Sequence, residues 1–111
     1  MKRIERWLGV ALLALGAGTA QAKDCTLLIL GDSLSSGHGL KPGSGWVELF
    51  ARRAAPRGWK VVNASVSGDT TQNGLARLGP ALDRHRPADV VVELGGNDAL
   101  RGTPPEVIRQ N

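Results

Sequence analysis

The stretch Thr26-Leu27-Leu28-Ile29-Leu30-Gly31-Asp32-Ser33 decides the fold. Its first five residues form an apolar run that includes β-branched side chains, and the run ends at Gly31. A short run of this kind is typical of a strand that is buried on both faces, as in a parallel sheet. The polar residues Asp32 and Ser33 follow at once, at the point where such a strand would end.

Two later segments repeat this pattern of a β-branched run followed by a polar turn that contains glycine. Residues 60–64 predict a second strand and residues 89–94 a third. The turns that follow them are Ser67-Gly68-Asp69 and Gly95-Gly96-Asn97-Asp98. Helical patterns separate the strands, and this alternation predicts an α/β protein with a parallel sheet.

The segments between the strands have the apolar spacing of helices. The first places four apolar residues on one helical face, Trp46, Leu49, Phe50 and Ala54. We expect the pair of aromatic residues in it to pack in the core, the alternative being an acyl-binding pocket. The second has a stripe of leucines, Leu75, Leu78 and Leu82. Gly79-Pro80 interrupts this stripe, where we expect a kink or a break. A third helix is expected to begin within residues 104–108.

The first residues of the chain have the pattern of a secretory signal. A basic start is followed by an uncharged run from Trp7 to Ala22, which ends in Ala20-Gln21-Ala22. These are the three parts of a signal peptide, and the run is shorter than the ~20 residues of a membrane-spanning helix. We therefore expect residues 1–22 to be removed after Ala22 and residues 23–111 to be secreted or periplasmic. An uncleaved N-terminal anchor is the alternative.

Charge, aromatic content and cysteine content exclude several classes of protein. The net charge of the 111 residues is +4, but the expected signal carries part of the basic charge and the remaining arginines are scattered. Without a dense basic patch or a platform of aromatic residues, we expect no nucleic-acid partner. One cysteine excludes an internal disulfide and a CxxC metal site. No strand is followed by a glycine-rich nucleotide-binding motif, and we expect neither a metal nor a cofactor.

The three polar turns carry residues that acyl transfer requires. Turns at the carboxyl ends of parallel strands meet at one edge of the sheet. Acyl transfer needs a nucleophilic hydroxyl, a base and donors aimed at the oxyanion. Ser33 offers the hydroxyl, Gly68 a backbone N–H without a side chain beside it, and Asn97 a side-chain amide. Each turn alone is also explained as an ordinary turn or helix cap, but the three together favour a hydrolase site.

The same turns carry a resemblance to a known family. Gly31-Asp32-Ser33-Leu34-Ser35 resembles the GDSL motif that opens the SGNH hydrolases, and the two later turns resemble the second and third blocks of that family. Order and spacing match, and the likeness covers nearly all of residues 26–103. It implies a three-layer, flavodoxin-like α/β/α sandwich, of which residues 23–111 would form the N-terminal part.

The resemblance also implies a role for each matching residue. Ser33 would be the nucleophile, and its N–H, the Gly68 N–H and the Asn97 amide would form the oxyanion hole. Asp32 and Asp98 would support them. The implied substrates are small acyl esters, acyl thioesters and lysophospholipids, and the implied activities are those of an arylesterase, an acyl-CoA thioesterase or a lysophospholipase.

One part of the family pattern is missing. The base of the family is a histidine in an Asp-x-x-His block near the C-terminus, and neither histidine of this chain, His38 or His85, lies in such a block. We therefore expect an N-terminal fragment of a hydrolase that is inactive alone. A catalytically dead truncated product or a non-catalytic module is the alternative. Further strands of the family's sheet would lie beyond the third strand, so we expect Val90-Val91-Val92 to present an open apolar edge.

Overall fold

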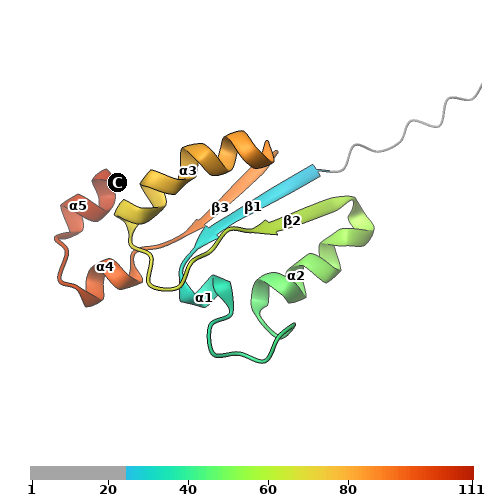
Figure 1. Cartoon of the computed structure of the whole chain (residues 1–111), viewed down its shortest axis with the longest axis horizontal. Coiled ribbons are helices and arrows are strands. Elements are labelled where there is room, and N and C mark those ends of the chain that lie inside the picture. The colour runs from blue at the N-terminus through green and yellow to red at the C-terminus, as the bar shows by residue number, and fades with distance from the viewer. Residues whose placement is uncertain (1–24) are drawn as a thin grey trace, which may run out of the picture.

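Figure 1 shows a computed structural model of the chain, which describes residues 25–111. Three parallel strands form one sheet in the order β2-β1-β3: β1 (Cys25–Gly31), β2 (Trp59–Asn63) and β3 (Asp89–Glu93). The deciding stretch is the central strand, and in its register Leu28 lies between Val62 and Val90. The expected signal peptide, residues 1–22, lies outside the described residues.

Helices connect the strands and cover both faces of the sheet. In chain order they are α1 (Ser33–Ser36), α2 (Trp46–Ala54), the short 3₁₀ helix η1 (Ala55–Arg57), α3 (Thr71–His85), α4 (Gly96–Leu100) and α5 (Pro105–Gln110). α2 lies on one face and α3 on the other (Figure 1). This three-layer α/β arrangement and its strand order confirm the expected flavodoxin-like fold class. The short helices α1 and α4 begin within or directly after two of the polar turns and were not predicted.

The core is built around β1. Leu28, Ile29 and Leu30 are almost inaccessible to solvent. Because side chains alternate along a strand, Ile29 faces α2 and packs with Val47, whereas Leu30 faces α3. Gly74 lets α3 approach the sheet closely, since a Cβ at this position would overlap the side chain of Leu94.

The expected packing of α2 is wrong in one respect. The helix forms as predicted, but its buried residues are Val47 and Ala54. Trp46 and Phe50 are 41% and 43% exposed in the described structure. At 3.6 residues per turn, Trp46 lies about 100° around the helix from Val47. The side of α2 that meets the sheet is therefore centred on smaller residues, and the large apolar side chains lie beside the contact.

α3 is also more regular than its sequence predicts. It is one helix over Thr71–His85 with Pro80 inside, so the expected break at Gly79-Pro80 does not occur. Pro80 has no N–H to donate to the carbonyl of Ala76. Both residues are exposed, so water can bond to that carbonyl and the helix continues.

The expected open edge at β3 is confirmed. Within residues 25–111, β3 pairs with β1 alone. Val90 and Val91 are more than one third exposed, and Val92 is 58% exposed. The apolar sequence of β3 is typical of a strand that is buried on both faces, but in residues 25–111 its side chains are only partly covered.

Candidate active site

Ser33 is the first residue of α1 and follows the end of β1 after a single residue. That residue, Asp32, caps the helix, because its Oδ1 accepts a hydrogen bond of 3.0 Å from the Leu34 N–H. Asp32 is 3% exposed, whereas Ser33 is only half-buried. The turn therefore holds a buried carboxylate beneath a serine that solvent and small molecules can reach.

Glu93, at the end of β3, holds the same turn from the neighbouring strand. Its Oε2 accepts hydrogen bonds from the Ser35 hydroxyl at 2.7 Å and from the Asp32 N–H at 3.3 Å. Gly31 faces Glu93 across the sheet, and a Cβ at Gly31 would lie 2.7 Å from that carboxylate oxygen. Sequence reasoning did not place Glu93 in the site, since only the register of β1 and β3 brings it there.

Gly68 lies in the loop between β2 and α3. Its φ of 86° is in the left-handed region that favours glycine. A Cβ at this position would meet nothing within 4 Å, so the residue borders open space. The loop is tied to its neighbours by a hydrogen bond of 2.9 Å between the Ser67 and Ser36 hydroxyls and by one of 3.2 Å from Arg101 to the Gly68 carbonyl.

Asn97 lies on α4 and joins the three turns. Its side-chain amide donates a hydrogen bond of 2.9 Å to the Asp69 carbonyl in the second turn. The same nitrogen has a longer contact, 3.5 Å, to Oδ2 of Asp32 in the first turn. The structure thus brings the three predicted motifs together at the carboxyl ends of the strands.

Asp98 fixes α4 against the start of α3. It is 1% exposed, and its two carboxylate oxygens accept the Thr71 N–H at 2.8 Å and the Thr71 hydroxyl at 2.6 Å. The hydroxyl hydrogen bond is the main reason why the pKa of Asp98 is lowered below its ordinary value, and Arg101 contributes in the same direction. A carboxylate at the N-terminus of α3 also complements the helix dipole.

The two histidines lie in different parts of the fold. His38 is exposed, in the loop after α1. α3 starts near the carboxyl ends of the strands and runs back along the sheet (Figure 1). Its last residue, His85, is therefore near the opposite edge from Ser33.

Residues 25–111 meet neither the requirements of a metal site nor those of a membrane-spanning helix. They contain no group of three or more His, Cys, Asp or Glu side chains that could hold a metal ion. None of their helices combines the length and the apolar composition that crossing a membrane requires.

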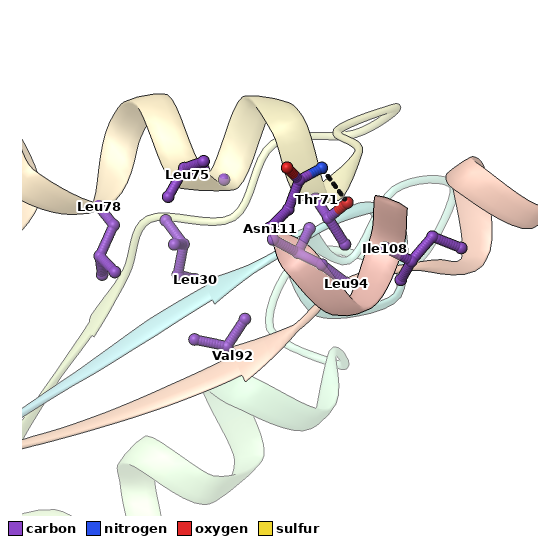
Figure 2. A pocket seen from close by; sticks show the side chains of 9 residues that line it. Leu30, Thr71, Leu75, Leu78, Val92, Leu94, Ile108 and Asn111 are labelled. Carbon is purple, nitrogen blue, oxygen red and sulfur yellow. Dashed lines mark hydrogen bonds between the residues drawn. The ribbon is translucent and has the colours of Figure 1, made fainter. Parts of the chain in front are cut away.

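A mostly apolar pocket lies beside the polar edge, between α3, β3 and α5 (Figure 2). Its volume is about 290 Å³. Its apolar lining includes Leu30, Leu75 and the exposed Val92. At its polar end, the Asn111 side chain donates a hydrogen bond of 3.0 Å to the Thr71 hydroxyl.

A flavodoxin-like parallel sheet with these three motifs at its carboxyl edge defines the SGNH hydrolase fold. The chain belongs to the GDSL-like lipase/acylhydrolase family, whose sequence model matches residues 29–111. The family expected from the three motifs is therefore confirmed.

Relatives with names and structures agree with this assignment. The chain is 52% identical to esterase TesA of Pseudomonas aeruginosa over 101 residues, which cover 89% of this chain and 50% of the relative. It is 49% identical to thioesterase 1/protease 1/lysophospholipase L1 of Escherichia coli over 106 residues, which cover 95% of this chain and 50% of the relative. A crystal structure of TesA superposes with a TM-score of 0.73 at 53% identity, covering 77% of this chain and 48% of that one. The chain thus spans about half the length of these relatives.

Proposed function

We propose that this chain supplies the nucleophile and the oxyanion hole of a serine hydrolase that cleaves acyl esters and thioesters. The observation that carries the proposal is the position of Asn97. Its amide bonds to the second turn and contacts the first, which carries Ser33. Three motifs that are far apart in sequence are joined in this way at one edge of the sheet.

In the proposed reaction, Ser33 Oγ attacks the carbonyl carbon of the substrate. A bond forms between Oγ and carbon, the hydroxyl proton passes to a base, and the carbonyl oxygen becomes an oxyanion. The N–H groups of Ser33 and Gly68 and the amide of Asn97 donate to that oxyanion. Collapse of the intermediate breaks the bond to the alcohol or thiol, which leaves with a proton. Water then hydrolyses the acyl-enzyme and regenerates the serine.

Asn97 suits this role because one of its two N–H bonds is already engaged. The bond to the Asp69 carbonyl orients the amide, and the other N–H has only the long contact to Asp32. An oxyanion is a stronger acceptor than a partner 3.5 Å away. Asp32 and Asp98 have a supporting role in this proposal, because the carboxylate of Asp32 caps α1 and that of Asp98 accepts the Thr71 N–H at the start of α3.

The base is proposed to lie outside residues 25–111. His38 is exposed in a loop and His85 is near the opposite edge of the sheet, and neither lies in an Asp-x-x-His block. The relatives are about twice as long as the segment that they share with this chain, which leaves room for such a block.

The proposed substrates follow from the names of the relatives. These names are those of an esterase and of a thioesterase that is also a lysophospholipase, and a further relative, 45% identical over 108 residues, is an arylesterase of Vibrio mimicus. We therefore propose small acyl esters, aryl esters included, acyl thioesters and lysophospholipids as substrates. We also propose that the signal peptide is cleaved after Ala22 and that residues 23–111 belong to a secreted or periplasmic protein.

The test is Ser33→Ala in the full-length gene product, assayed on a p-nitrophenyl ester, an acyl-CoA and a lysophospholipid. Loss of the nucleophile should lower turnover on the order of a millionfold. Ser44→Ala is the matched control, because Ser44 is an exposed serine of the following loop. Wild-type turnover in Ser33→Ala would refute the proposal.

A catalytically dead product is the alternative for the chain alone, because a base of the family type is absent from it. Under both hypotheses residues 23–111 should show negligible turnover of a p-nitrophenyl ester, and an Asp-x-x-His block encoded in frame downstream of Asn111 would favour the fragment over the dead product. Turnover that disappears in both Ser33→Ala and His38→Ala would instead assign the base to His38.

A further inference from the structure

Arg77, on α3, holds both ends of the loop that contains Gly68. Its Nε donates a hydrogen bond of 2.8 Å to Oδ2 of Asp69, and its Nη2 lies 2.7 Å from the same oxygen. Its Nη1 donates a hydrogen bond of 2.8 Å to the carbonyl of Ala64. Ala64 directly follows β2 and Asp69 precedes the cap of α3, so one guanidinium group closes the whole loop.

The helix places Arg77 for this contact. Side chains of a helix lean toward its N-terminus, so Arg77 reaches back over the first turns of α3 toward Asp69. The ion pair is only partly shielded from water, with side chains 32% exposed for Arg77 and 12% exposed for Asp69. The planar guanidinium presents several donors in a fixed geometry, which a lysine cannot reproduce.

Asp69 connects Arg77 to the proposed oxyanion hole. Its carboxylate is held by Arg77, while its carbonyl accepts the Asn97 amide at 2.9 Å. The residue before it is Gly68, which supplies the proposed backbone donor. Two of the three proposed oxyanion donors therefore depend on the position of one residue.

We propose that Arg77 is a positioning residue of the oxyanion hole. It sets the Gly68 N–H and the Asn97 amide through Asp69 and does not itself contact the substrate. This inference rests on the proposed function.

The first test is Arg77→Lys in the full-length gene product, assayed on a p-nitrophenyl ester. Lysine keeps the charge but cannot bond to Asp69 and Ala64 together. Since misplacing a catalytic group by about 1 Å can cost roughly a hundredfold in rate, we expect kcat to fall about tenfold to a hundredfold. We expect KM to change by less than about twofold, because uniform binding is not altered. Arg84→Lys is the matched control, since Arg84 is an exposed arginine of the same helix, and its kinetics should equal those of wild type.

A second measurement separates positioning from a general loss of structure. In NMR spectra of the same variants, the side-chain amide protons of Asn97 should shift and exchange faster in Arg77→Lys, while the amides of β1 remain protected. Arg84→Lys should leave the Asn97 signals in place. Should Arg77→Lys fail to fold, Asp69→Asn serves instead, because it keeps the shape of the side chain, removes the ion pair and carries the same expectations.

The outcomes distinguish this inference from the proposed function. Ser33→Ala with wild-type turnover would overturn the function and this inference with it. A dead Ser33→Ala together with wild-type kcat in a folded Arg77→Lys would overturn the inference alone. Lower kcat with unchanged Asn97 signals would also overturn it.

Discussion

Two neighbouring residues at the carboxyl end of β3 have opposite environments. Its last residue, Glu93, accepts hydrogen bonds from the Ser35 hydroxyl and the Asp32 N–H of the nucleophile turn. The residue before it, Val92, is 58% exposed and borders the apolar pocket. The polar edge of the sheet is thus ordered by local contacts, whereas the strand beside it is only partly buried.

This contrast follows from the physics of the two kinds of interaction. Hydrogen bonds are directional and are satisfied between neighbouring turns once the strands are in register. Burial of apolar side chains needs further layers or strands around them. The polar edge therefore requires only three strands to take its shape. The four predictions below test whether the polar edge and the partly buried strand β3 are independent of each other.

The largest effect is expected for Asn97→Ala, which acts on the polar edge alone. Removing one oxyanion donor typically costs about 10²–10³ in kcat, so turnover of an aryl ester by the full-length gene product should fall at least about a hundredfold. The midpoint of thermal unfolding should change little. Gln72→Ala, which removes an exposed amide from α3, is the control, and a near wild-type rate in Asn97→Ala would remove Asn97 from the oxyanion hole.

Gly74→Ala should act on the packing of α3 against the end of β3. The added methyl group would overlap Cδ1 of Leu94, so this side chain must turn away; overpacking costs about 1–3 kcal/mol in the free energy of unfolding, offset by up to about 1 kcal/mol because alanine favours the helix. Urea unfolding measures the change. Gly79→Ala is a matched control on the same helix, because its Cβ would meet nothing within 4 Å. It should be neutral or stabilise by up to about 1 kcal/mol, and equal effects of the two variants would contradict the proposed close packing.

The exposed strand β3 should cause residues 23–111 to associate with one another. An open apolar edge is a template for pairing with another chain, so residues 23–111 should form oligomers in sedimentation experiments. Val92→Lys should weaken this association about tenfold, or roughly 1.4 kcal/mol. Leu40→Lys is the control, since Leu40 is an exposed leucine in a loop far from β3 in the sequence. A stable, cooperative monomer of residues 23–111 would contradict the prediction.

The smallest effect is expected from the titration of Asp98. Its pKa is lowered in the folded state, mainly by the Thr71 hydroxyl, so the unfolded state binds a proton more readily. The stabilisation is fully present above the ordinary pKa of about 3.9 and is lost as pH falls through the lower folded value. Thermal unfolding of Asp98→Asn should therefore depend less on pH below about 4 than that of wild type. Gln72→Ala, an exposed change on α3 that removes no titratable group, should keep the wild-type dependence, and parallel curves for wild type and Asp98→Asn would contradict the assignment.

Local patterns predicted most of the fold and named the three motifs. β1 and the polar turn after it were evident because a buried strand is a short apolar run that ends abruptly. The side of α2 that faces the sheet was not predictable, since helical spacing fits both Trp46 and its neighbour Val47. Glu93 and Arg77 were missed because their partners are set by the register of β1 with β3 and by the approach of α3 to a loop. No spacing along the sequence encodes either relation.

Because β1 is the central strand, the strand that is made first completes its pairing only after the last strand has been made. Leu27 is made early, but its partners Val61 and Asp89 follow only after one and two crossover connections. Every strand pair in the described sheet thus closes a long loop before it gains contacts, a property of slowly folding chains. During that interval the apolar central strand is unpaired, which leaves it open to association with other unfolded chains.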